Sequence, residues 1–419
     1  MMRWARRAVL ALLVAGLVAA GVASWRFANY AAPDAAVPPD ATAQAWFVDA
    51  YAPARAAFLA EGERLSGSFA RVQRFAIPVA DSASSPPLSI DGLYVPAQRQ
   101  PLRLLVLTSG VHGVEGPAGS AVMRLFMREF MTPEALADTG VLLLHTLNPW
   151  GFAHQRRVTE HNVDLNRNAG RDATLYHTQN AGYPLVDGLI NPAGPADPGA
   201  MQHRLFLLDA LSQIARHGMA PLRQAVLQGQ YTHPRGIYFG GQALEPQLAA
   251  LAPVIRPMLD AYPLSLSIDL HTGYGARGVL HVFPNPPTDP RVRQGLEAVF
   301  AGQRIDWGDG KDFYTVMGDV TSWLGQLRSG GMHLPAVFEF GTLDSQTTLG
   351  AIKSLHITVL ENQGAQHGYA SDADKARILR DYREMFNPSS AVWRTQVIAS
   401  SRAALRQVMA RLPQVTAQP

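Results

Sequence analysis

Cysteine is absent from the 419 residues of the sequence. Its absence excludes disulfide bonds, thiol nucleophiles and cysteine metal sites together, so His, Asp and Glu remain as the available metal ligands. The sequence also contains no Gly-x-Ser-x-Gly motif, which disfavours a serine hydrolase. A His-Glu-x-x-His motif is missing too, which excludes the zinc peptidases that depend on it.

Charged residues are scarce, at 16% of the chain, whereas 47% of the residues are hydrophobic. A chain of this length and composition can bury a large core, which favours a globular protein. The net charge is only +3, and no block of lysine or arginine is interleaved with aromatic residues. We therefore expect no nucleic-acid partner.

Residues 1–30 have the composition of a signal peptide or an N-terminal membrane anchor. Three arginines precede an apolar run, Ala8–Ser24, whose length lies at the boundary between the two. Small residues near its end would suit cleavage, whereas Trp25 and Arg26 at its far edge favour an uncleaved anchor. Either alternative predicts export, to the periplasm or the extracytoplasmic face of the inner membrane. The membrane is a partner if the segment stays uncleaved.

The rest of the chain predicts a linker at residues 31–40 and a single catalytic domain at residues 41–419. The linker is rich in alanine and proline and has little to bury. The domain is predicted to be α/β, with a central mixed, mostly parallel sheet flanked by helices on both faces. Its pattern indicates helices at 41–65, 117–130, 202–217 and 246–262, a hairpin at 69–78 and 88–95, an ordered loop at 170–201, and two helices within 372–412.

One stretch, Leu104–Ser120, places polar chemistry directly after a buried strand. The strand pattern stops at Gly110, and a glycine-rich turn then carries His112 and Glu115 before a helix begins at Pro117. A histidine and a glutamate three residues apart on such a turn can both reach one cation.

Three later stretches repeat this design of an apolar run followed by polar residues. In open α/β sheets, ligands bind beyond the carboxyl ends of the strands, so these stretches predict one shared site. The stretches are Val141–Thr146 with Val163–Asn168 after it, Leu264–Leu270 ending on His271, and Ala336–Phe340 carrying Glu339. The predicted metal ligands are His112, Glu115 and His271. Two His and one Glu leave a fourth position for water, which is typical of one catalytic Zn²⁺ per chain.

The order of these motifs resembles that of the M14 zinc carboxypeptidases. His-x-x-Glu, Val-Asp-Leu-Asn-Arg-Asn, a strand-terminal His and a final strand Glu follow one another as in that family. The contexts GVHGVEG, NVDLNRN, DLHTGYG and FEFGTL are similar to its DUF2817 branch, from about Phe47 to Arg402. The resemblance implies zinc-dependent hydrolysis of an amide next to a free carboxylate, in a peptide or an acylated amino acid.

The resemblance also implies roles for individual residues. Glu339 would take the proton from the attacking water, and burial of this acidic residue on an apolar strand could raise its pKa toward the working range. Asp164 would accept a hydrogen bond from His112. Asn166 and Arg167 would clamp the substrate carboxylate.

Other roles are less defined by the motifs. Arg157 is preferred over Arg156 as the arginine that stabilises the oxyanion. Asp269 is expected to point away from His271 if the strand continues. The tyrosine near the leaving group stays open among Tyr231, Tyr238 and Tyr274. His233 is a candidate for a pocket wall, whereas His281 is expected to be structural.

Two alternative functions compete with a metallocarboxypeptidase. A deacylase of the succinylglutamate desuccinylase and aspartoacylase type would share the fold, the metal triad and the Asn-Arg pair. A non-catalytic exported binding protein would be expected to have lost Glu339 or a metal ligand, and neither is lost.

Overall fold

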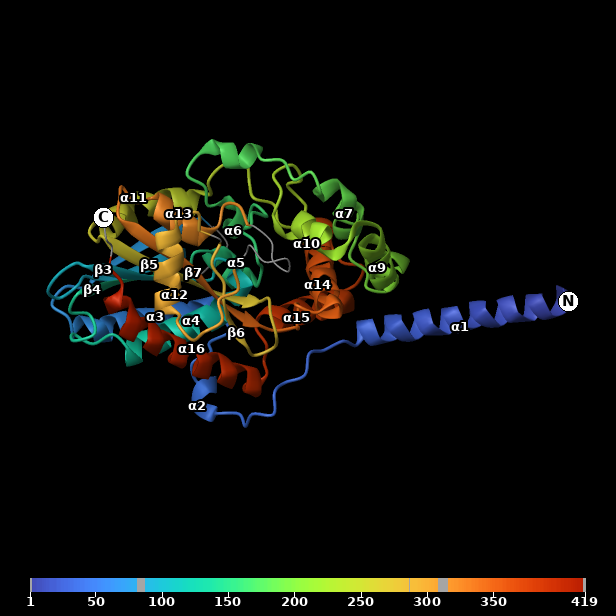
Figure 1. Ribbon diagram of the computed structural model, residues 1–419, viewed down its shortest axis with the longest axis horizontal. Coiled ribbons are helices and arrows are strands. Elements are labelled where there is room, and N and C mark those ends of the chain that lie inside the picture. Colours follow the sequence, from blue (N-terminus) through green and yellow to red (C-terminus); the bar gives the residue numbers. More distant parts are fainter. Residues whose placement is uncertain (1, 81–86, 286, 308–315, 417–419) are drawn as a thin grey trace.

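A mixed sheet occupies the centre of the computed structural model, which describes residues 2–80, 87–285, 287–307 and 316–416 (Figure 1). Within these residues the strand order is β1-β2-β4-β3-β5-β7-β6. The strands are β1 Gln73–Val79, β2 Leu88–Val95, β3 Arg103–Ser109, β4 Thr139–His145, β5 Leu264–Gly273, β6 Leu280–Val282 and β7 Met332–Gly341. This architecture confirms the predicted α/β fold.

The four central strands β4, β3, β5 and β7 run parallel to one another. The outer strands β2 and β6 pair antiparallel with β4 and β7, and β1 pairs antiparallel with β2 in the predicted hairpin. Because parallel strands end at the same edge of a sheet, the segments after β3, β4 and β5 are brought together there.

Helices cover both faces of the sheet, as predicted. One face packs against α3 Tyr51–Ser66, α4 Gly116–Glu129, α12 Pro290–Val299 and α16 Ala391–Arg411. The other packs against α11 Pro246–Asp260 and α13 Val320–Gln326. Figure 1 shows α11 and α13 above the sheet and α4 and α16 below it. The short helices α2 Ala41–Gln44, α5 Pro149–His154 and α6 Leu165–Asn168 lie in connections.

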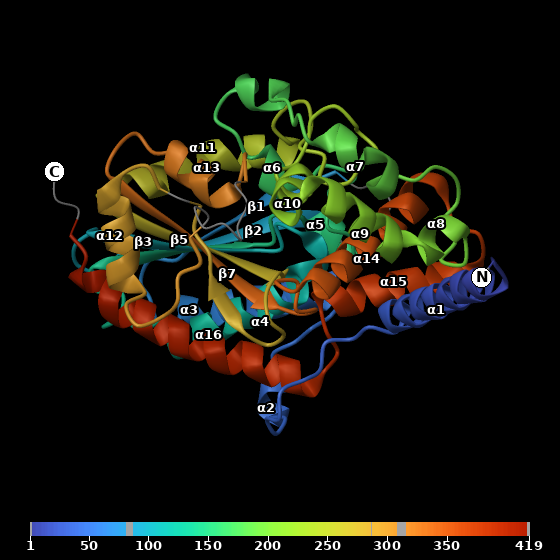
Figure 2. The same cartoon turned by 45° about the vertical axis from the view of Figure 1, so that its right-hand side comes forward.

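The segment 183–227, here called the cap, lies against α14 Thr348–His367. It contains α7 Tyr183–Ile190, α8 Met201–Arg204, α9 Phe206–His217 and α10 Met219–Leu227. Side chains of α7, α9 and α10 share a buried apolar cluster with α14. Figure 2 shows the cap beside α14 and α15, Asp372–Phe386, at the end of the molecule from which α1 extends.

The N-terminal helix α1, Met2–Ala28, is long and apolar enough over Leu10–Ala28 to cross a membrane. Its last turn contacts the domain, because Phe27 is 3% exposed and stacks on His356 of α14 at 5.5 Å between ring centroids. Residues 31–39 form no helix or strand. The alternatives of a signal peptide and an anchor stay predictions.

Two predicted segments differ from the structure. The helix expected at 41–65 is interrupted at 45–50, and α3 begins at Tyr51. Pro53 lies in the first turn of α3, where the backbone N–H that proline lacks would have no partner within the helix. The loop expected at 170–201 contains α7, because Tyr183, Val186 and Ile190 form one buried helical stripe. The two helices expected within 372–412 are confirmed as α15 and α16, with a break after Phe386.

The buried His145 at the end of β4 predicts a pH-dependent stability. Its ring stacks on Phe58 with 4.7 Å between centroids, its Nε2 lies 3.0 Å from Ser120 Oγ, and burial lowers its pKa to about 3. Below the unfolded pKa of about 6.5, the unfolded chain binds a proton that the folded chain does not. Stability should therefore fall as the pH drops from 6.5 toward 3, with this residue contributing up to about 1.4 kcal/mol per pH unit.

Chemical denaturation at several pH values checks this expectation. His145→Gln should make the slope of unfolding free energy between pH 6 and 4.5 shallower by about one proton. His217→Gln, which changes an exposed histidine of α9, is the control and should keep the wild-type slope. Equal slopes in wild type and His145→Gln would contradict the expectation.

A candidate metal centre at the ends of the parallel strands

Three predicted ligands, His112, Glu115 and His271, converge at the edge where β3 and β5 end. Within the residues that the structure describes, they form a group of His and carboxylate side chains whose ligand atoms lie within 4.8 Å of one another. His112 Nδ1 lies 2.8 Å from Glu115 Oε1, and His271 Nδ1 lies 2.9 Å from Glu115 Oε2. The two Nδ1 atoms are 3.1 Å apart. Ligands around a tetrahedral Zn²⁺ lie roughly 3.3 Å apart, so the three donors fit one ion.

The outer nitrogen of each histidine faces an aspartate. His112 Nε2 lies 3.1 Å from Asp164 Oδ1, and His271 Nε2 lies 2.6 Å from Asp269 Oδ2. An aspartate on the outer nitrogen orients a metal-binding imidazole and directs its other nitrogen toward the ion. The predicted contact between Asp164 and His112 is therefore present.

The expectation for Asp269 was wrong. Side chains two residues apart on a strand point to the same face, and β5 continues through His271 to Gly273. Asp269 therefore lies beside His271, where it also accepts a hydrogen bond from Thr108 Oγ1 at 2.6 Å. The strand period alone was sufficient to find this contact.

Charge within the cluster keeps Glu115 and Asp164 ionised. Burial would raise the pKa of Glu115, but His112 and His271 outweigh it and lower that pKa below its ordinary value. Burial would likewise raise the pKa of Asp164, but Arg157 and His112 hold it well below its ordinary range. Buried carboxylates of this kind require positive charge close by.

Glu339 of β7 enters the same cavity and is paired in register with His271. Its Oε1 accepts a hydrogen bond from the Tyr274 backbone N–H at 2.9 Å. Burial, reinforced by the nearby negative charge of Glu115, raises the pKa of Glu339 to about 8. A carboxyl group with this pKa can accept and return a proton near neutral pH.

The two candidate arginines on the connection after α5 face different surroundings. Arg157 lines the cavity, donates from Nε to Asp164 Oδ2 at 2.9 Å and has Nη1 3.7 Å from Glu115 Oε1. Arg156 instead pairs with Glu361 of α14 at 2.8 Å. This placement agrees with the preference for Arg157.

Asn166 and Arg167 both line the cavity. Asn166 Oδ1 accepts from the Val320 backbone N–H at 3.0 Å. Arg167 donates from Nε and Nη2 to Leu227 O and from Nη1 to Asn166 O. The close passage of the Arg167 side chain requires a glycine at 229, where a Cβ would lie 2.7 Å from Arg167 Cδ.

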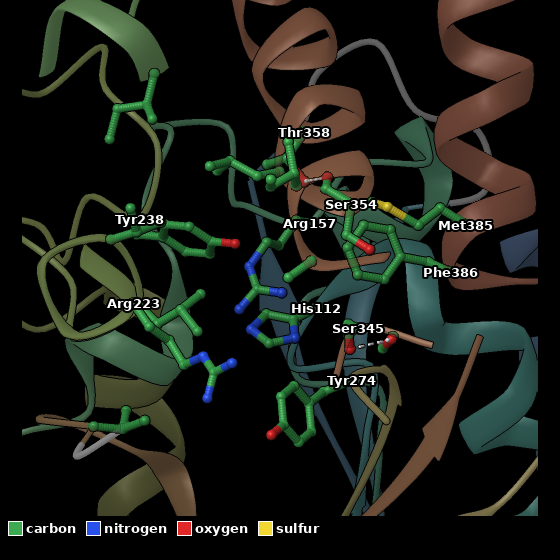
Figure 3. A pocket seen from close by; sticks show the side chains of 18 of the residues that line it. His112, Arg157, Arg223, Tyr238, Tyr274, Ser345, Ser354, Thr358, Met385 and Phe386 are labelled. Carbon is green, nitrogen blue, oxygen red and sulfur yellow. Dashed lines mark hydrogen bonds between the residues drawn. The ribbon is translucent and has the colours of Figure 1, made fainter. Parts of the chain in front are cut away.

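Tyr238 and Tyr274 are the cavity tyrosines among the three candidates (Figure 3). The guanidinium groups of Arg157 and Arg167 both lie over the Tyr238 ring, at 5.1 and 5.6 Å from its centroid. Tyr231 is buried elsewhere and donates its hydroxyl to the Arg167 carbonyl.

Two further histidines considered in the sequence, His233 and His281, lie outside the metal cluster. His233 is exposed beside Thr232 and does not line the cavity, so its expected role as a pocket wall was wrong. His281 pairs through Nδ1 with Asp306 at 2.6 Å, as a structural residue would.

The fold and the cluster define an α/β protein with a candidate catalytic metal centre at its parallel strand ends. A family model described as Protein of unknown function (DUF2817) matches residues 47–400. The chain belongs to the DUF2817 family. This match confirms the resemblance drawn from the motifs, over nearly the same residues.

Several solved structures are similar to the chain at low identity. Bovine thrombin-activatable fibrinolysis inhibitor, in complex with tick carboxypeptidase inhibitor, is 13% identical at a TM-score of 0.40, covering 80% of this chain and 98% of that one. Carboxypeptidase A from Helicoverpa armigera is 13% identical at a TM-score of 0.36, and the match covers 74% of this chain and 71% of that one. Succinylglutamate desuccinylase/aspartoacylase from Rhodobacter sphaeroides is 17% identical at a TM-score of 0.33, and the match covers 71% of this chain and 66% of that one. The curated proteins contain no match.

The geometry predicts which variants lose the metal. Purified full-length protein loaded with zinc should carry about one ion per chain, and His112→Ala or His271→Ala should abolish stoichiometric binding. Glu339→Gln should keep the ion, because Glu339 is not among the three ligands. Elemental analysis after dialysis measures this, and full zinc content in both histidine variants would refute the site.

The contact between Asp269 and His271 predicts a weaker effect. Asp269→Asn should lower zinc affinity about 10- to 100-fold in a chelator competition, because the ligand histidine loses its oriented charged partner. Asp306→Asn removes a histidine partner at the same 2.6 Å separation outside the cluster and should leave the affinity unchanged. Equal affinities for both variants would mean that Asp269 does not orient a ligand.

Proposed function

We propose that the protein is an exported zinc-dependent hydrolase that cleaves an amide bond next to a free carboxylate. In its simplest form the reaction removes the C-terminal residue of a peptide, as a metallocarboxypeptidase does. The observation that carries the proposal is the meeting, in one cavity, of the His112, Glu115 and His271 cluster with Glu339 and the Asn166-Arg167 pair.

A zinc ion held by His112, Glu115 and His271 would polarise the scissile carbonyl and acidify a water molecule. Glu339 would accept the proton of the attacking water on its carboxylate and pass it to the leaving nitrogen. Its hydrogen bond from the Tyr274 backbone N–H fixes one carboxylate oxygen and leaves the other for this transfer. Arg157, held by Asp164, would donate to the carbonyl oxygen as negative charge develops there.

Arg167 is the proposed anchor for the substrate carboxylate. Its hydrogen bonds to Leu227 O and Asn166 O use one N–H on each of its three nitrogens. A guanidinium has five N–H donors, so one remains on each of Nη1 and Nη2. Two donors at that end of the group suit a bidentate pair with a carboxylate.

A peptide with a free C-terminus and its C-terminally amidated counterpart test this pairing. The amide should be about 30- to 1000-fold poorer in kcat/KM, which corresponds to roughly 2–4 kcal/mol for one charge-assisted pair. Arg167→Ala should impose a similar loss on the acid and little further loss on the amide, since both changes remove one interaction.

Arg156→Ala is the matched control, because Arg156 pairs with Glu361 and should not affect the preference for acid over amide. Additive losses for Arg167→Ala and amidation would mean that Arg167 does not bind the carboxylate. Equal rates on acid and amide in the wild type would point to an internal amidase instead.

Deacylation of N-acyl amino acids is the second candidate, and the apolar part of the cavity favours it. Such substrates carry the same amide and carboxylate, so the same residues would act on them. Mass-spectrometric screening of zinc-loaded protein against peptide and acyl-amino-acid libraries separates the candidates. Products from the second library alone would overturn the carboxypeptidase assignment, and no products from either would favour a non-catalytic binding protein.

A further inference from the structure

The cavity that contains the metal cluster extends under the cap as an apolar chamber. The whole cavity, metal end included, has a volume of about 210 Å³, against the roughly 10–15 Å³ that holds one water molecule. Apolar side chains of the cap and α14 form its wall, including Leu189, Ile190, Ile214, Leu222, Val226 and Leu355. A chamber with this lining, in a cavity that holds far more than one water molecule, is suited to an organic group that water solvates poorly.

The wall is longer than a single amino-acid side chain. On α10 the lining residues run from Met219 to Leu227, which at 1.5 Å per residue is roughly 12 Å of helix. Residues of α7, α9 and α14 line the same chamber. Polar groups are few on this wall, with Gln213 on α9 and Ser354 and Thr358 on α14 among them. An unbranched alkyl chain can follow its apolar stretches, where the backbone N–H and C=O groups of a peptide would find few hydrogen-bond partners.

The charged side chains lie toward the metal end of the cavity. Arg157 and Arg167 both lie over the Tyr238 ring and line the cavity with the metal cluster. In Figure 3 the guanidinium group of Arg223, on α10, points toward His112 and Tyr274, so its stem belongs to the wall while its charge faces the metal end. The chamber thus pairs a polar end with an apolar end, as an amphiphilic ligand requires.

Exposed large hydrophobic side chains are concentrated in the cap. Of the seven large hydrophobic side chains that are exposed in the described residues beyond α1, four lie in the cap: Leu185, Met201, Leu205 and Leu211. The apolar helix α1 ends against this region, with Phe27 in the cluster formed by α7, α9, α10 and α14. Lys353 of α14 also donates to the Ala28 carbonyl at 3.0 Å. A membrane crossed by α1 would therefore lie next to the cap.

We propose that the chamber under the cap holds a long alkyl chain, which belongs to the acyl group of the scissile amide because no single amino-acid side chain is as long as the wall. The substrate is then an N-acyl amino acid, or a peptide carrying such a chain, that partitions into the membrane. This inference rests on the proposed function for the position of the amide and the carboxylate. The alkyl chain itself is bound without chemistry, so its binding can be measured separately.

Binding of N-acylglycines with acyl chains of four to twelve carbons tests the chamber directly. The protein is full-length Glu339→Gln in detergent-free nanodiscs, and equilibrium dialysis measures the dissociation constant below the micelle concentration of each ligand, with empty nanodiscs subtracted. Each added methylene should tighten binding about two- to fourfold until the chamber is filled. Affinity that does not change with chain length would overturn the proposal.

A matched pair of substitutions on α9 locates the chain. Ile214→Trp should fill the chamber and reduce binding of the twelve-carbon ligand at least tenfold while leaving the four-carbon ligand unaffected. Leu211→Trp adds the same side chain at an exposed position of α9 that does not line the cavity, and it should change the binding of neither ligand. If Ile214→Trp binds the long chain as wild type does, the chain lies elsewhere. Leu355→Trp on α14 repeats the test if Ile214→Trp does not fold.

Hydrolysis by zinc-loaded wild type separates the failure of this inference from failure of the proposed function. Chain-dependent binding without hydrolysis of any amide would refute the hydrolase and leave the alkyl chamber. Hydrolysis of short acyl or peptide substrates, together with an affinity that does not change with chain length, would support the hydrolase and refute the alkyl chamber. Faster cleavage of the twelve-carbon substrate embedded in the same membrane than of the dissolved one supports a membrane source, and slower cleavage overturns that source.

Discussion

The carboxylate of Glu115 is the contact on which the site depends. It touches the inner nitrogens of His112 and His271 and accepts the Thr272 backbone N–H, so it joins the turn after β3 to the end of β5. This is possible because β3 and β5 are neighbouring parallel strands that end at the same edge. A buried carboxylate is costly without positive charge nearby. The contacts of Glu115 with two imidazole nitrogens place the position for that charge among these three side chains.

The sequence contained most of the metal cluster because each ligand lies at the end of an apolar run or on the turn that follows it. His112, Glu115 and His271 could therefore be assigned to one sheet edge without any knowledge of long-range contacts. Asp164 required the family motif, since no local pattern links it to His112. Asp269 was assigned to the wrong face of its strand, although side chains two residues apart point to the same face. Arg157 could be preferred over Arg156, but its contact with Asp164 could not be predicted.

The cap and α14 were harder to predict for a physical reason. Helix α14 buries polar side chains as well as apolar ones, and their partners are distant in sequence, such as Arg156 for Glu361 and His203 for His356. Its buried face therefore does not read as an apolar stripe. Helix α7 is short and lies in a stretch rich in glycine and proline, where turn residues mask its three buried positions.

Charge balance connects the metal ligands to the proposed base. Glu115, Asp164 and Asp269 bring three carboxylates into one buried region, while Arg157 contacts two of them and Arg167 is bound mainly to carbonyl oxygens. Neutral histidines would leave this region short of positive charge, which a divalent cation supplies. Glu339 experiences the same balance, because burial and the charge of Glu115 raise its pKa. Burial is the largest cause of this raised pKa, while the positive charge of His271 opposes it and the negative charge of Glu115 adds to it. A change in the charge of either ligand therefore changes how readily Glu339 gives up its proton, so metal binding and base strength are linked.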